Sequence, residues 1–417
     1  MSRAAGLVVA ALAVGGLSLV PAPAALAADA ADGGAPACTQ GQTQYAEEPS
    51  PALTNLAVPA SWGVATGRGV TVAVVDSGIN LGNRHFPEGS VVPGTSLVPG
   101  DTTAGRTDSY GHGTAVSGII GARAIPGITS GMIGVARDAQ LMPVRVFDRV
   151  RQDGAPEPAA PLTGERIAEG IRWAVDNGAD VVNVSLSVPA NSSGLAAMKS
   201  ALQLAERRDV VVVAASGDNV ADPEQTVVQD RYPASEPTVL GVSALNAEGV
   251  VDSRSIQGPH VDVSAPGTNV LVTYQSYGDC QDDATLTSWS APFVAGLAAQ
   301  LKERFPRATA EEIRYRITST ARRPVADQRD DAQGWGLIQP YEALTADLDE
   351  RRAGPAAPDA APVEDEVTAS GAEPLSAVPD PLAPARDEAV WWAIGGVGLA
   401  AVALVLRPLV RRRVADD

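Results

Sequence analysis

Short runs of valine, isoleucine and alanine, each of about strand length, recur along the middle of the chain and limit its fold more than any other feature. The run at 70–79 has no polar alternation, so we interpret it as a parallel strand that helices cover on both faces. Similar runs predict strands at Leu141–Phe147, Val181–Leu186, Val210–Ala215 and Val261–Val263.

Helix-like stretches separate several of these runs. Between 165 and 177 the apolar positions follow the helical period, and Gly178 is a typical helix end. A second helix is predicted at Leu195–Arg207, and Thr309 and Glu312 have the spacing of a capping box at the start of another. This alternation predicts an α/β fold with a mostly parallel sheet and helices on both faces.

Three polar residues stand where such a fold places its chemistry. Asp76 ends the first strand, and open α/β sheets bind their ligands at the carboxyl ends of strands. His112 lies between two glycines, before small residues that begin a helix. Ser288 begins an apolar helix, with Pro292 expected in its first turn. A helix N-terminus favours the negative charge of an oxyanion, although most serines at helix starts are only caps.

Together these residues have the composition of an acyl-transfer triad. Ser288 would attack a carbonyl, His112 would take its proton, and Asp76 would orient the imidazole. The chain order Asp, His, Ser is that of subtilisin. At these three blocks the sequence resembles the subtilisin-like (subtilase) serine peptidases, and the resemblance covers residues 62–344. The alternative is three unrelated polar residues, each common by itself.

The resemblance also implies a substrate cleft. Its lining would be Ser185, Leu186, Ser187, Ala215, Ser216 and Gly217, which would pair with an extended peptide as an added strand. Subtilases commonly carry two glycines after Leu186, whereas this chain has Ser187 and Val188. These larger residues would narrow the pocket for the side chain that precedes the cleaved bond.

The oxyanion site departs from the family pattern. Subtilases place an asparagine amide where this chain has Asp218, with Asn219 one residue later. An ionised Asp218 would repel the developing negative charge and would help only when protonated. A local bulge that brings Asn219 into place is the alternative. One branch of the subtilase-like proprotein convertases also has aspartate here.

Two further departures flank the serine. Leu286 stands where the family has glycine, and it would be strained if the position needs a left-handed backbone or a close backbone approach. Ser290 replaces the usual alanine. These changes predict weak or narrow activity.

The chain termini predict an extracytoplasmic, membrane-anchored protein. Residues 1–27 resemble a secretory signal, with an uncleaved anchor as the alternative, and 28–61 would form an arm wrapped on the domain. Outside the cytoplasm Cys38 and Cys280 would pair, the alternatives being two free thiols or intermolecular bridges.

The segment after the catalytic domain is interpreted as a tether. Residues 345–389 read as an Ala/Pro/acidic disordered linker, 390–410 as a transmembrane helix, and 411–417 as a basic cytoplasmic tail. The segment Gly334–Leu344 resembles the closing segment of mycosins, the membrane-anchored subtilases of type VII secretion systems, although Gln339 stands where aspartate is commoner.

Several partners are excluded by composition. The net charge of −18 argues against nucleic acid. His85 and His260 are interpreted as structural, and no metal or other cofactor is predicted.

The resemblance implies two functions that do not exclude each other. The first is a membrane-anchored endopeptidase that cleaves a peptide or protein substrate of the secretion system. The second is a catalytically weakened or inactive subtilase-fold subunit that stabilises the secretion membrane complex. A general secreted scavenging protease is disfavoured by the membrane helix at 390–410 and by the short segment at 28–61, where a folded pro-domain would need more residues.

Overall fold

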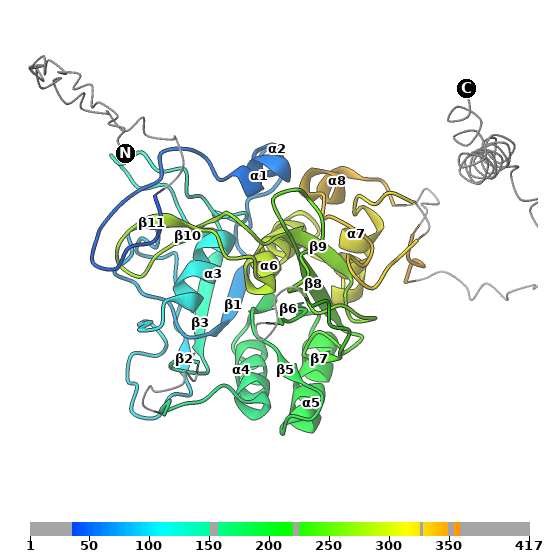
Figure 1. The fold of residues 1–417 in the computed structure, drawn as a ribbon, viewed down its shortest axis with the longest axis horizontal. Coiled ribbons are helices and arrows are strands. Elements are labelled where there is room, and N and C mark those ends of the chain that lie inside the picture. The colour runs from blue at the N-terminus through cyan, green and yellow to red at the C-terminus, as the bar shows by residue number, and fades with distance from the viewer. Residues whose placement is uncertain (1–35, 151–156, 220–224, 326–327, 349–353, 359–417) are drawn as a thin grey trace, which may run out of the picture. The chain divides into compact units, whose positions relative to one another are not determined.

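Seven parallel strands form the central sheet of the computed structural model, in the order β2-β3-β1-β4-β6-β8-β9 (Figure 1). The structure describes residues 36–150, 157–219, 225–325, 328–348 and 354–358. The strands are β1 (Thr71–Asp76), β2 (Thr95–Ser96), β3 (Gln140–Arg145), β4 (Val181–Val184), β6 (Val211–Ala215), β8 (Val239–Leu245) and β9 (Val263–Pro266).

Strand β1 is apolar at successive positions because its side chains alternate between two buried cores, one on each face of the sheet. Val72 and Val74 belong to the core on one face of the sheet, whereas Ala73 and Val75 belong to the core on the other. All four are fully buried, as expected for a parallel strand with both faces covered.

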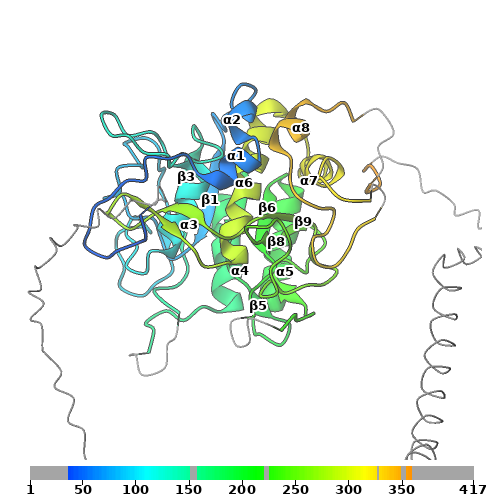
Figure 2. The same ribbon diagram turned by 45° about the horizontal axis from the view of Figure 1, so that its top comes forward.

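Helices cover both faces, as the sequence predicted. The helices are α1 (Pro51–Asn55), α2 (Val58–Ser61), α3 (His112–Gly121), α4 (Gly164–Asp176), α5 (Leu195–Arg207), α6 (Thr287–Arg304), α7 (Ala310–Ser319) and α8 (Pro340–Thr345). Figure 1 shows α4 and α5 on one side of the sheet and α3 and α6 on the other, and the two buried clusters divide in the same way. Figure 2 shows α2 next to α8, and the two helices are in contact.

Helix α6 is the central helix of its layer. Every residue from Thr287 to Leu301 is buried. The expectation that Pro292 lies in the first turn is wrong, because α6 begins at Thr287 and Pro292 is its sixth residue. Pro292 has no N–H, so the carbonyl of Ser288 receives no i→i−4 hydrogen bond from it.

Most predicted elements are present, but one strand is misplaced and the central strand β8 was not predicted. The capping box at Thr309 and Glu312 is present. The strand predicted at Val261–Val263 instead begins at Val263 and ends at Pro266. The backbone N–H of Val261 donates to the Gly258 carbonyl, so Val261 closes a turn. Only the next residue, Asp262, donates its N–H to β8, at the carbonyl of Gly241, and the paired register begins at Val263.

Two small antiparallel pairs complete the described structure. One consists of β5 (Val188–Pro189) and β7 (Arg231–Tyr232), and the other of β10 (Val270–Thr273) and β11 (Asp279–Asp282). The N-terminal arm follows the second pair through bridges between Ala37 and Gln281 and between Gln44 and Gly278.

A disulfide between Cys38 and Cys280 fixes the arm beside β11. Within the described ranges, no helix has both the length and the apolar character that crossing a membrane requires. The predicted signal at 1–27, most of the linker, the membrane helix at 390–410 and the tail lie outside those ranges.

Candidate active site

The end of β1 supplies a buried carboxylate. Asp76 is fully buried, and its Oδ1 accepts from His112 Nδ1 at 2.8 Å and from the Ser77 N–H at 2.8 Å. The second bond fixes the carboxylate against its own backbone. The imidazole therefore has its Nδ1 committed to Asp76, which leaves Nε2 as the nitrogen able to accept a proton.

His112 is positioned by the turn before α3. Gly111 has φ +98°, a backbone conformation that L side chains rarely adopt, and His112 is the first helical residue. Asp108 holds this turn, because its Oδ1 accepts from the Gly111 N–H at 2.7 Å and its Oδ2 from the Thr114 N–H at 2.9 Å. Asp108 had no role in the sequence-based predictions, although an aspartate four residues before His112 has the spacing for such a cap.

The charge state of His112 depends on its carboxylate neighbours. Burial lowers the pKa of His112, but the charge and hydrogen bond of Asp76 outweigh it, and Asp108 and Asp218 add to the increase. The pKa of His112 therefore lies above its usual 6.5. A base with this environment is neutral above its raised pKa and stabilises the imidazolium that proton abstraction creates.

Ser288 lies between two residues that contact the rest of the site. Its own side chain is buried, with 7% exposure. On one side Trp289 stacks on the His112 ring, with centroids 5.1 Å apart and planes 28° apart. On the other side Thr287 is bound by Asp218.

Among the described residues no hydrogen bond joins the Ser288 hydroxyl to His112. Hydrogen bonds of this kind are often long in enzymes without substrate and tighten on binding. As the second residue of α6, Ser288 has no acceptor for its N–H within the helix, so this N–H can donate to an oxyanion.

The Asp218 carboxylate lies against Thr287, the first residue of α6. Its Oδ1 accepts from the Thr287 N–H and its Oδ2 from the Thr287 hydroxyl, both at 2.9 Å. Burial raises the pKa of Asp218 to about 6, against the lowering effect of the two Thr287 bonds. At pH 7 Asp218 is therefore mostly ionised.

The alternative role for Asn219 does not fit its position. The Asn219 side-chain amide donates to the Gln225 carbonyl at 3.1 Å, and its backbone N–H to that of Arg254 at 2.7 Å. Leu286 has a φ of −141°, extended backbone that any residue adopts, so the left-handed conformation considered for this position is absent. The Ser290 hydroxyl donates to the carbonyl of Ala265 at 3.1 Å.

The predicted cleft residues end two neighbouring strands. The first group, 185–187, follows β4, and the second, 215–217, ends or follows β6, which pairs with β4 in parallel. Arg231 on β7 binds the first group, since its Nη2 donates to the Ser187 hydroxyl at 2.9 Å and carbonyl at 3.2 Å. Arg231 was not predicted from the sequence, because the residues around a lone arginine give no sign that it lies at the edge of a distant sheet.

The two other histidines have structural contacts. His85 is fully buried, with Nε2 2.8 Å from Asp279 and Nδ1 2.8 Å from the Arg123 carbonyl. His260 Nε2 lies 3.2 Å from the Ser216 carbonyl, next to the predicted cleft. In the described part of the chain, no group of three His, Cys, Asp or Glu side chains has an arrangement able to hold a metal ion.

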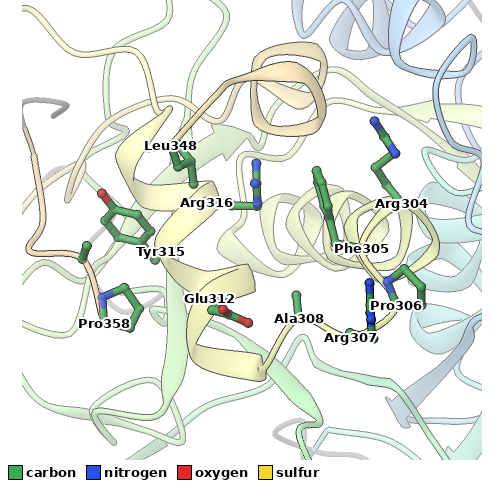
Figure 3. Close-up of a pocket in the computed structure, with 11 residues that line it drawn as sticks. Arg304, Phe305, Pro306, Arg307, Ala308, Glu312, Tyr315, Arg316, Leu348 and Pro358 are labelled. Carbon is green, nitrogen blue, oxygen red and sulfur yellow. The ribbon is translucent and has the colours of Figure 1, made fainter. Parts of the chain in front are cut away.

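A pocket of about 580 Å³ lies at the opposite end of α6 from Ser288. Figure 3 shows the Phe305 ring between Arg304 and Arg316, whose guanidinium carbons lie 5.2 and 3.9 Å from its centroid. At 1.5 Å per helical residue, Arg304 is about 24 Å along the axis from Ser288. The pocket is therefore separate from the Asp76–His112 site.

Comparison with known proteins agrees with this geometry. Residues 67–336 match the Subtilase family. The chain belongs to the subtilase family. Mycosin-1 of Mycobacterium tuberculosis (strain ATCC 25618 / H37Rv) is 34% identical over 340 residues, which cover 71% of this subtilase and 73% of mycosin-1. This relationship makes the chain a serine peptidase relative of the mycosins.

Solved structures give the same relationship. The MycP3 protease from the type VII (ESX-3) secretion system matches with a TM-score of 0.63 and 28% identity, covering 75% of this subtilase and 92% of that chain. A chain in the periplasmic assembly from the ESX-5 inner membrane complex matches with a TM-score of 0.62 and 27% identity, covering 76% and 91%.

Proposed function

We propose that this subtilase is a membrane-anchored serine endopeptidase that acts in type VII secretion, with Asp76, His112 and Ser288 as its catalytic triad. The observation that carries the proposal is the 2.8 Å bond between the buried Asp76 carboxylate and His112, one of whose ring faces is covered by the residue next to Ser288.

The proposed reaction begins with attack of Ser288 Oγ on the peptide carbonyl. His112 Nε2 takes the hydroxyl proton and later gives it to the leaving amine, while Asp76 holds the imidazolium. The tetrahedral oxyanion accepts from the Ser288 N–H. Water then attacks the acyl-enzyme as His112 Nε2 takes its proton, and His112 returns that proton to Ser288 Oγ as the ester bond breaks. In the net reaction the peptide C–N bond and one O–H bond of water are broken, and a C–OH and an N–H bond are formed.

The weakest part of this mechanism is the oxyanion site. An ionised Asp218 contributes no donor there and adds repulsion, whereas its protonated form has an O–H to offer. In subtilisin, a relative, loss of one such donor lowers kcat by about 10²–10³. We therefore expect a slow enzyme.

The second candidate function is a subunit that stabilises the secretion membrane complex. It is favoured by Asp218, which opposes catalysis, and by the likeness to a chain in the ESX-5 periplasmic assembly. In both functions residues 390–410 would anchor the chain, with the peptidase domain outside the cytoplasm and the basic tail inside.

The test is labelling of the full-length chain in isolated membranes with a serine-directed fluorophosphonate. We expect a labelled band that is absent in Ser288→Ala and in His112→Ala and that persists in the exposed control Ser200→Ala. A chain that ends after residue 344 should carry the label but leave the membrane fraction. No labelling of a folded wild-type chain would reject the peptidase and favour the assembly function.

A further inference from the structure

Arg231 lies across the gap between the two predicted cleft segments. Its Nε and Nη2 lie 3.2 and 2.9 Å from the Ser187 hydroxyl. On the opposite side, a side chain at Gly217 would meet Arg231 Nε at 3.0 Å and the Ser187 hydroxyl at 2.9 Å. The guanidinium is thus in the slot between Ser187 and Gly217, where the resemblance places the side chain that precedes the cleaved bond.

This guanidinium is half-buried and has no ion pair among the described residues. The carboxylate whose charge acts on the Arg231 guanidinium is that of Asp218, and both of its oxygens already accept hydrogen bonds from Thr287. Burial lowers the pKa of Arg231, and the charge of Asp218 opposes that effect. Arg231 makes three hydrogen bonds to Ser187, all from Nε and Nη2. Within the described ranges, the N–H groups of Nη1 are therefore left to donate to another acceptor.

We propose that Arg231 selects substrates with an aspartate or glutamate immediately before the cleaved bond. The inference rests on the proposed peptidase function and names its substrate class. A carboxylate in the slot would accept two parallel N–H bonds from the guanidinium, the geometry for which arginine is best suited. The substrate carboxylate would also neutralise the charge of the half-buried Arg231 guanidinium.

Other side chains fit the slot less well. A leucine or phenylalanine would have to displace the guanidinium or leave it buried without a counter-charge, which costs free energy in either case. A lysine would be repelled. Gly217 has φ +102°, and a Cβ there would lie within 3.0 Å of the Ser187 hydroxyl and of Arg231, so the guanidinium keeps its place only while this position is glycine.

The test uses full-length protein and two classes of reagent. A small fluorophosphonate reports whether Ser288 reacts at all. Peptidyl diphenyl phosphonates that differ only in the residue before the phosphorus (glutamate, glutamine or leucine) report the preference. We expect the glutamate reagent to react about ten- to hundredfold faster than the glutamine reagent, the range for a hydrogen bond to a charged group.

Two substitutions isolate the role of Arg231. In Arg231→Gln the two rates should become equal within twofold, while fluorophosphonate labelling persists and shows that the variant is folded. The matched control Arg172→Gln, on the exposed face of α4, should keep the wild-type ratio.

Two failures are distinguishable. Equal rates for glutamate and glutamine in a wild-type chain that the fluorophosphonate labels would overturn this inference alone. A preference that survives Arg231→Gln would overturn it as well. No labelling of the folded chain by any reagent would overturn the proposed function and this inference together.

Discussion

In the proposed mechanism, Asp218 and His112 serve the reaction in opposite protonation states. The pKa of Asp218 is about 6, and its protonated form is the one that can donate to the oxyanion. The pKa of His112 lies above 6.5, and its neutral form is the base. Because the pKa of Asp218 lies below that of His112, only a minor fraction of molecules has a protonated Asp218 together with a neutral His112 at any pH.

This order of pKa values predicts the pH dependence of wild-type activity. From low pH, kcat/KM should rise as His112 loses its proton and fall as Asp218 ionises, giving a low bell with one limb near pH 6 and the other above pH 6.5. Asp218→Asn should remove the fall, leaving a single rise to a plateau. The measurement is kcat/KM on a peptide anilide between pH 4.5 and 9.

The control for this profile is Glu248→Gln, an exposed charge change that should leave the bell in place. A wild-type plateau at high pH, equal in shape to that of Asp218→Asn, would show that Asp218 has no part in the reaction.

At this scale the sequence predicted residues whose motifs are local. Asp76 ends a valine run and His112 lies between glycines, so their neighbours in the chain identify them. Trp289 and Arg231 have no such signal: the stacking of Trp289 on His112 and the contact of Arg231 with Ser187 depend on how distant segments meet. Whether Leu286 is strained could not be predicted, because a family glycine does not by itself reveal the φ angle.

At the scale of elements, α6 fixes the position of Ser288 through close packing on its neighbours. Gly296 faces Val135, and a Cβ added there would lie 2.6 Å from Val135 Cβ. Gly296→Ala should therefore lower the free energy of unfolding by about 1–3 kcal/mol, the usual cost of overpacking a core. Chemical denaturation measures this change.

The matched control is Gly63→Ala, where an added Cβ has one ordinary contact, 3.4 Å from the Ala60 carbonyl. It should change stability by less than about 0.5 kcal/mol. Equal effects of the two substitutions would show that α6 has room at Gly296.

Strands and long helices were predictable because their apolar periods are strong. The helix at Leu195–Arg207 has the predicted bounds, and β1 carries its two faces in strict alternation. The strand at Val261 and the turn position of Pro292 were not predictable, since both depend on where pairing or helical hydrogen bonding begins.

At the scale of the whole molecule, the disulfide joins residues 242 apart and holds the N-terminal arm beside β11. Asp279 supports the same attachment, since its Oδ1 accepts from the Ala46 N–H at 2.7 Å. Cys38→Ser with Cys280→Ser should lower the free energy of unfolding by about 2–5 kcal/mol, mainly by freeing the unfolded chain.

Thermal unfolding under oxidising conditions measures this loss, and the exposed Thr39→Ser is its control. The double variant should also be cut faster by protease within residues 36–50. An unchanged midpoint and unchanged cleavage would mean that the arm is held without the bridge.

We propose that the triad of this subtilase is intact and that Asp218 limits its rate. The most direct measurement is kcat/KM of Asp218→Asn against wild type at pH 8, with Asp218→Ala to separate loss of charge from gain of a donor. We predict an increase of about 10²–10³ for the asparagine variant and a smaller one for alanine, following the value of one oxyanion donor. If the asparagine variant folds normally but is no faster than wild type, Asp218 does not limit the reaction.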